Sequence, residues 1–209
     1  MNQDSTTLYL IRHGEIEANV NRHWHGSTDS ELNENGRRQA QQMALHVAKN
    51  HPEISAVYCS PLRRTFHTAS PLAKRLNLDL QADADLREYS IGHLEGTPYE
   101  ELMDKHEFFK SIASNPDYAP EGGESLNQVC LRVVAALTRL KKRHQGQSIA
   151  IVSHGAAMGI ALTHLLDNRV YPFHDYHMVN TGYSKLVWSS EPILEFFNVS
   201  DHLSAAQIG

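Results

Sequence analysis

The sequence predicts an α/β protein, a three-layer α/β/α sandwich built around a mostly parallel sheet. One observation and one rule of sheet connectivity lead to this prediction. Short apolar segments alternate along the chain with longer segments of helical spacing, and parallel strands need such helical connections. The chain has 209 residues without an internal repeat or a low-complexity linker, so residues 1–209 are expected to form one domain.

The first strand is expected at residues 6–11, where Leu8, Leu10 and Ile11 are apolar. The polar residues 19–31 that come after it are expected to form a loop. Asn33 is a suitable N-cap for a helix over about 34–50, whose apolar side chains fall on one face.

A second strand is expected at residues 55–59. Pro61 is placed at the first position of the next helix, where its missing N–H costs nothing, and that helix extends to about residue 76. Residues 78–86 are ambiguous and are assigned as a short edge strand.

Pro98 is expected to open a helical stretch that continues to about residue 112, and residues 115–123 form a Pro/Gly loop. Ser125 and Gln128 match a capping box that begins a long helix, which Gly146 stops.

The last part of the chain repeats the strand-then-helix order. A strongly apolar strand is expected at residues 148–152, directly followed by a helix to about residue 166. Residues 184–188 and 193–197 are the expected closing strands.

Composition is typical of a soluble globular protein, with 41% hydrophobic and 21% charged residues. The net charge of -5 disfavours nucleic-acid binding. Cys59 and Cys130 are too few for a disulfide framework, which fits a reducing cytoplasm. The N-terminus lacks an apolar signal core, and no stretch approaches the roughly 20 apolar residues that span a membrane. We therefore expect a cytoplasmic protein without a nucleic-acid or membrane partner.

Two histidines, His13 and His154, stand directly after apolar strands, and each is followed by glycine. Ligands of open α/β sheets bind at the carboxyl ends of the strands. Arg12 precedes the first histidine, and Arg64 follows a third strand. Guanidinium groups match phosphate oxygens, so these strand ends are expected to form an anion pocket.

The chemistry of such a pocket is phosphoryl transfer. A phosphate monoester carries about -1.5 to -2 charges at neutral pH. Arg12, Arg64 and His154 could neutralise that charge and stabilise the transferring group. The same positive charges are expected to keep His13 neutral, as a nucleophile must be.

Several motifs in this order resemble the histidine phosphatase superfamily, the phosphoglycerate mutase-like proteins. They are Leu10-Ile11-Arg12-His13-Gly14-Glu15 with Asn19, Gly26 and Asp29; Ser60-Pro61-Leu62-Arg63-Arg64-Thr65; Leu86-Arg87-Glu88 with Gly92 and Glu95-Gly96; Gly122-Gly123-Glu124-Ser125; and Val152-Ser153-His154-Gly155. One Arg-His-Gly tripeptide is a weak signal, whereas five motifs in order are a strong one.

The resemblance implies a phosphoglycerate mutase-like fold and a role for each matched residue. His13 becomes the phosphohistidine, and Arg12, Arg64 and His154 bind the phosphoryl group. Glu88 acts as acid and then as base for water. The expected substrate-binding residues are Asn19, His25, Gly26, Tyr89 and Gly155. No metal and no organic cofactor is implied.

Departures from the mutase pattern favour a phosphatase. Tyr99 aligns with the lysine of cofactor-dependent mutases, and only Lys105 and Lys110 supply cations between Arg87 and Arg132. A bisphosphorylated or carboxylated substrate would find few partners there. A phosphoglycerate mutase and a non-catalytic protein that holds a phosphorylated ligand are the alternatives.

The segment at about residues 90–123 is expected to be a small helical lid. Its aromatic residues Tyr99, Phe108, Phe109 and Tyr118 would make the lid partly apolar, which suits a substrate with an organic body. The expected partner is a small phosphorylated metabolite, such as an alpha-ribazole phosphatase or a broad-specificity phosphatase accepts. A phosphoprotein substrate and a homodimer stay open.

The histidine-rich segments His23-Trp24-His25 and His174-Asp175-Tyr176-His177 lack the spacing of a helical zinc pair. We interpret them as loop residues, with His174 or His177 near the rim of the pocket.

Overall fold

The structure, a computed structural model, describes residues 5–204 and residue 207. The other positions of the predicted 1–209 domain lie outside the described residues. A six-stranded sheet with the order β3-β2-β4-β1-β5-β6 forms the centre of the molecule. The strands β3, β2, β4 and β1 pair in parallel, while β5 runs antiparallel to both of its neighbours. The mostly parallel sheet is therefore confirmed.

The strands are β1 (Thr6–Arg12), β2 (Ile54–Cys59), β3 (Leu80–Ala82), β4 (Ser148–Ser153), β5 (Tyr183–Trp188) and β6 (Pro192–Val199). The α-helices are α1 (Glu17–Val20), α2 (Glu34–Asn50), α3 (Arg63–Leu76), α4 (Tyr99–Asp104), α5 (Phe108–Ser114), α6 (Leu126–Arg143) and α7 (Gly155–Asp167). Three 3-10 turns complete the described elements: η1 (Ala84–Leu86), η2 (Gly92–Leu94) and η3 (Phe173–Tyr176).

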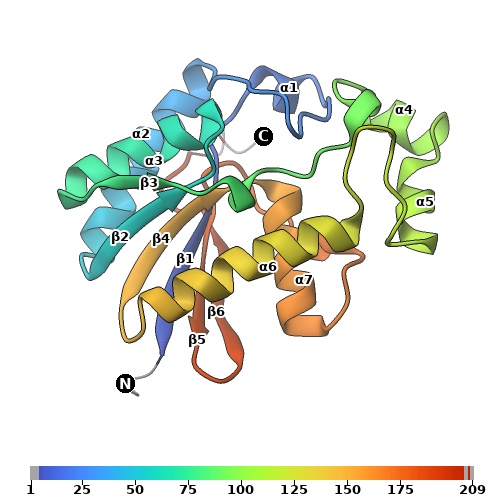
Figure 1. Cartoon of the computed structure of the whole chain (residues 1–209). Helices are drawn as coiled ribbons and strands as arrows, with labels where there is room; N and C mark the ends of the chain where they lie inside the picture. Colours follow the sequence, from blue (N-terminus) through green and yellow to red (C-terminus); the bar gives the residue numbers. More distant parts are fainter. Residues whose placement is uncertain (1–4, 205–206, 208–209) are drawn as a thin grey trace.

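Alternation along β1 shows how the sheet separates two hydrophobic cores. Leu8 and Leu10 pack with the buried faces of α6 and α7. Tyr9 and Ile11 point to the opposite face and pack with α2 and α3. Successive side chains of a strand alternate between faces, so this one buried strand contributes to both cores. Figure 1 shows the resulting three layers, with α6 and α7 on one side of the sheet and α2 and α3 on the other.

Two helix starts agree with their predicted caps. The Asn33 side chain accepts a hydrogen bond from Gly36 N, and Ser125 and Gln128 form the reciprocal capping box of α6. The predicted start of α3 is wrong. Pro61 lies before the helix, whose N-cap is Leu62, while the proline inside α3 is Pro71.

Two other predictions need correction. The predicted loop 19–31 includes the end of α1, because Asn19 Oδ1 accepts a hydrogen bond from Ile16 N and closes a single helical turn. The single predicted helix through residue 112 is two helices, α4 and α5. Glu107 stands between them with a φ of 45°, a left-handed conformation that interrupts a right-handed helix.

The helices α4 and α5 project beyond the sheet at one end of the molecule (Figure 1). Leu102, Phe108 and Ile112 are fully buried and attach them to the core on the α6 side. A lid function for the predicted insertion at about 90–123 stays a prediction. Within the described part of the chain, no helix is long and apolar enough to cross a membrane.

Candidate active site

The carboxyl ends of β1 and β4 bring the two predicted histidines together. These strands are parallel neighbours, and their last residues, Arg12 and Ser153, are partners in the register. His13 and His154 follow directly, and their ring centroids lie 5.3 Å apart. Adjacent parallel strands that end at the same level therefore place two imidazoles side by side at one edge of the sheet.

His13 has one ring nitrogen free for chemistry. Its Nδ1 lies 2.7 Å from the Gly14 carbonyl oxygen, which can only accept, so Nδ1 carries the proton and Nε2 keeps its lone pair. The side chain is only 4% exposed. Burial, followed by the charges of Arg64 and Arg12, lowers the pKa of His13 well below 6.5. The neutral imidazole has the protonation state of a nucleophile.

His154 has both ring nitrogens engaged. Arg64 Nε donates to His154 Nδ1 at 3.2 Å, so the proton resides on Nε2, 2.8 Å from Ser60 Oγ. The side chain is fully buried. Burial lowers the pKa of His154 well below 6.5, and the charge of Arg64 lowers it further. As it lies, this histidine has no free lone pair with which to attack phosphorus.

Arg64 is fully buried behind the two histidines. Besides His154, its guanidinium donates to the carbonyl oxygens of His25, Gly26 and Thr28. A Cβ at Gly26 would lie 2.1 Å from the Tyr89 carbonyl oxygen, so only glycine allows this loop to approach so closely. Arg64 thus supplies a fixed positive charge and ties the 25–28 loop to the strand ends.

Arg12 lines the cavity and retains hydrogen-bonding capacity. Its Nη1 donates to the Met178 carbonyl oxygen at 2.6 Å and lies 3.5 Å from His177 Nε2. Its Nε is buried and has no partner among the described residues. A buried N–H without a partner is costly, and an anionic oxygen would satisfy it.

Glu88 is held at the N-terminus of α7. Its Oε1 accepts from the backbone N–H groups of Tyr89 and Ala157, and its Oε2 accepts from that of Ala156. The residue is 9% exposed and lines the same cavity as His13. The exposed amides and dipole of a helix N-terminus fix a carboxylate strongly. Three of about four acceptor sites are used, which leaves Oε2 able to exchange a proton.

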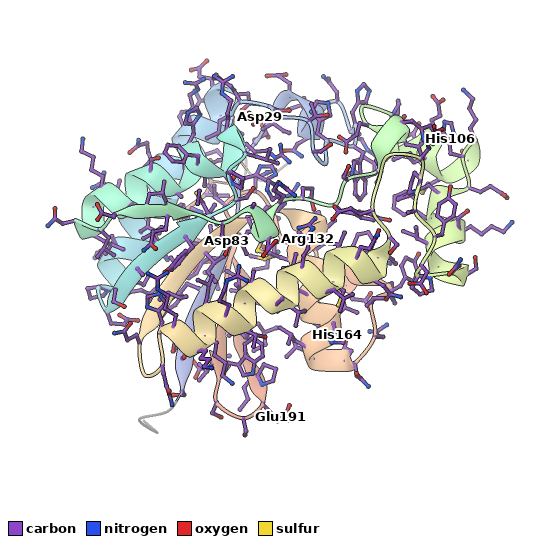
Figure 2. The ribbon with its side chains drawn as sticks, viewed as in Figure 1. Asp29, Asp83, His106, Arg132, His164 and Glu191 are labelled. Atoms are coloured by element: carbon purple, nitrogen blue, oxygen red, sulfur yellow. The ribbon has the colours of Figure 1, made fainter. Side chains whose placement is uncertain are left out.

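Arg132 organises the loop that carries Glu88, a role that sequence reasoning missed. It projects from α6 toward that loop near the centre of the molecule (Figure 2). Its guanidinium donates to the carbonyl oxygens of Asp85, Arg87 and Glu88 and makes a two-nitrogen contact with Glu124. All five N–H donors are used. Glu124 belongs to the Gly-Gly-Glu-Ser motif, so an arginine eight residues later, on the helix that begins after this motif, was the available signal.

Asn180 is another residue that sequence reasoning missed. Its Nδ2 donates to the His13 carbonyl oxygen at 2.9 Å and to Asn19 Oδ1 at 3.2 Å. Both asparagines line the cavity. Asn180 therefore fixes the backbone at the nucleophile and orients the Asn19 amide. It belongs to no motif that we identified, and nothing in the sequence distinguished it.

A cavity of about 920 Å³ opens in front of the strand ends. Among the residues predicted to bind substrate, Asn19, His25 and Gly155 line it. Gly26 and Tyr89 are not part of its wall. Tyr89 is fully buried and packs edge-on against Trp24, so the structure places it in the core. Its phenol ring packs against Trp24, which does line the cavity, and a motif position alone cannot distinguish such a place from one on the wall.

The predicted phosphoryl ligands also divide into two groups. Arg12 and His13 line the cavity, whereas Arg64 and His154 are not part of its wall and reach it through the contact of His154 with His13. His174 and His177 line the cavity as well, which agrees with their expected place near its rim. No group of three or more metal-ligating side chains is present in the described residues.

The sequence model of the histidine phosphatase superfamily (branch 1) matches residues 8–198. The chain belongs to this superfamily. The sequence prediction of an enzyme of the histidine phosphatase type is confirmed with it.

Relatives within the superfamily carry both phosphatase and mutase names. The chain is 38% identical over 159 residues to phosphoglycerate mutase-like protein 4 of Arabidopsis thaliana. These residues cover 74% of this chain and 69% of that protein. It is 32% identical over 199 residues to phosphoserine phosphatase 1 of Hydrogenobacter thermophilus, with 94% and 93% covered. Among solved structures, phosphoserine phosphatase of Entamoeba histolytica in complex with 3-phosphoglyceric acid superposes with a TM-score of 0.86 at 29% identity, covering 95% of this chain and all of that one.

Proposed function

We propose that this histidine phosphatase hydrolyses phosphate monoesters through a phosphohistidine intermediate on His13. One observation carries the proposal. Of the two histidines at the strand ends, only His13 combines a free ring nitrogen with a place on the cavity wall. The paired arrangement of His154 suits a residue that shapes the charge of the site.

In the first step, the lone pair of His13 Nε2 attacks phosphorus and the ester P–O bond breaks. The leaving oxygen takes a proton from Glu88, which must be protonated at that moment. The phosphorylated ring becomes cationic, and its Nδ1–H bond to the Gly14 carbonyl oxygen stabilises that charge.

In the second step, a water molecule attacks phosphorus and gives its proton to the Glu88 carboxylate. The P–N bond breaks, Nε2 recovers its lone pair, and phosphate leaves. Glu88 regains the proton that it lost in the first step. Its rigid anchorage on α7 keeps the carboxyl group in one place for both transfers.

The positive charges around His13 stabilise the phosphoryl group in transfer. Arg12 offers its unpaired N–H, and Arg64 supplies a buried charge from behind. Asn19 adds an amide from the cavity wall. Burial and the charges of Arg64 and Arg12 also lower the pKa of His13, which keeps its ring neutral between turnovers.

The phosphoryl group is transferred to water rather than to a second position of the substrate. The support for this is that the lysines of the α4–α5 region are not available to bind a second phosphate. Lys105 is paired with Glu101, and Lys110 with Glu107, and both lysines are largely exposed. Neither lines the cavity. A mutase must hold a bisphosphorylated intermediate, and these helices offer its second phosphate no free positive side chain.

The test is release of phosphate from a phosphate monoester in EDTA, without added metal. We expect steady turnover. Phosphate exchange between positions of phosphoglycerate, stimulated by a bisphosphorylated primer, would instead establish a mutase. Calorimetric phosphate binding without turnover on a broad metabolite panel would establish a binding protein.

We further infer that the substrate is a small phosphorylated metabolite and that the protein acts in the cytoplasm. Both described cysteines are free and buried, which suits a reducing compartment. A homodimer stays a prediction.

A further inference from the structure

The cavity is much larger than a phosphoryl group requires, and its outer wall is apolar. Beyond the strand ends, the wall is formed by side chains from four separate segments of the chain. These include Ile16, Val20, Tyr99, Met103, Phe109 and Phe173. Ligand cavities bind the body of a ligand through such apolar and aromatic surface, while a few polar groups orient it.

Two of these wall residues are apolar yet exposed. Val20 on α1 is 57% exposed and Met103 on α4 is 55% exposed. They belong to different elements and line the same cavity. Apolar surface left open to water at a cavity mouth is stabilised when a ligand covers it.

Positive charge is scarce on this outer wall. Arg22 lines it, but its side chain is 73% exposed and lies 3.9 Å from Glu100. Partial desolvation lowers the pKa of His25 and that of His177, and the charges of Arg64 and Arg12 respectively lower them further, which disfavours the cationic form of both imidazoles. A carboxylate on the body of the substrate would therefore leave water without a buried cation to receive it.

We propose that the preferred substrate is a phosphate monoester whose alcohol carries an uncharged aromatic ring, with the ring against Val20, Met103 and Phe109. The proposal rests on the phosphatase function argued above. It names the class of substrate, and it separates this site from one built for compact phosphorylated acids.

Three esters of primary alcohols test the proposal, because their leaving groups differ little in reactivity. They are 2-phenylethyl phosphate, ethyl phosphate and O-phosphoserine. We expect kcat/KM for 2-phenylethyl phosphate to exceed both of the others by about 10-fold or more, as burial of one ring allows. Equal values, or a preference for O-phosphoserine, would overturn the proposal while leaving the phosphatase function intact. If none of the three esters were hydrolysed, the phosphatase function itself would be refuted.

Variants of the wall locate the ring. Met103→Ser and Val20→Ser should each lower kcat/KM for 2-phenylethyl phosphate about 3-fold more than for ethyl phosphate. Leu131→Ser is the matched control, since Leu131 is 72% exposed on α6 and lies off the cavity wall. An equal effect of the wall variants on both esters would contradict the placement. A preference for O-phosphoserine that is lost in Arg22→Met would also contradict the placement, because it would show that Arg22 binds a carboxylate there.

Discussion

The ends of β1 and β4 carry the same local pattern, a buried histidine followed by glycine, yet they differ in what each imidazole can do. At the end of β1, His13 donates to its neighbour's carbonyl oxygen and keeps Nε2 free. At the end of β4, His154 is held between Arg64 and Ser60. The difference teaches that the partner of each ring, set by tertiary contacts, decides between a nucleophile and a positioning group.

The two ends also divide the remaining work. Two hydrogen bonds fix the backbone of the segment after β1: Gly14 N donates to Thr68 Oγ1, and Asn180 Nδ2 donates to the His13 carbonyl oxygen. The segment after β4 begins α7 and holds the Glu88 carboxylate. One end therefore presents the attacking atom, and the other presents the acid.

The largest expected effect comes from removing the free ring. His13→Ala should lower kcat at least about 10⁴-fold, because it removes the attacking lone pair of Nε2 and His154 has none free. Steady-state phosphate release measures it. His164→Ala on α7, away from the cavity, is the control and should retain activity. Turnover by His13→Ala within 10-fold of the parent would refute the mechanism.

Removing the paired ring should cost less. His154→Asn should lower kcat/KM roughly 10²- to 10³-fold, the loss of one main electrostatic contact, while phosphoryl transfer to His13 persists. Burst kinetics separate the two steps. If this variant lost all transfer to His13, the two histidines would share one role and the comparison would fail.

Weakening the contacts that hold the Glu88 loop should have an intermediate effect on kcat. Arg132→Lys keeps the charge but loses the planar fork that holds three carbonyl oxygens and Glu124, so kcat should fall about 10-fold with KM unchanged. Arg139→Lys, an exposed ion-pair residue on the same helix, is the control. A matching rise in KM would point to a disturbed substrate site instead.

Removing the hydrogen bond between His154 and Ser60 should have a small effect on kcat/KM. Ser60→Ala removes the acceptor of His154 Nε2, and one hydrogen bond is worth about 1 kcal/mol, so kcat/KM should fall roughly 5-fold. Kinetics at several pH values measure it. An effect as large as that of His154→Asn would show that Ser60 is itself catalytic.

Low pH should lower the stability of the folded protein through both His13 and His154. The folded-state pKa values of His13 and His154 lie well below 6.5, whereas the unfolded chain takes up protons near that pH. The unfolded chain therefore binds more protons than the folded protein below pH 6.5. The free energy of unfolding keeps its full value above that pH and falls below it, by at most about 1.4 kcal/mol per histidine and pH unit. Urea unfolding at pH 7.5 and 5.5 measures the loss. His154→Asn should show a shallower dependence, and equal stability at both pH values would contradict the assignment.

Much of this site could be predicted from local sequence because strand ends are local features. An apolar run, then Arg-His-Gly, placed His13 at the sheet edge, and the same pattern placed His154 beside it. The N-caps of α2 and α6 were predictable for the same reason, since Asn33 and Ser125 bond within three residues.

The rest depends on contacts between distant residues. Asn180 reaches His13 across 167 positions, and Arg132 reaches Glu88 across 44, with no periodicity to reveal either. Tyr89 adjoins the acid in sequence yet packs into the core. The break between α4 and α5 at Glu107 is a backbone conformation that residue type alone does not predict.

The most direct test of the central claim is to identify the residue that carries the phosphoryl group. The protein is mixed with a phosphate monoester, quenched in alkali within one turnover, digested and examined by mass spectrometry. We predict one phosphoryl group on the peptide that contains His13 and none on the peptide that contains His154. Phosphorylation of His154, or turnover with a pre-steady-state burst and no phosphorylated His13, would contradict the account.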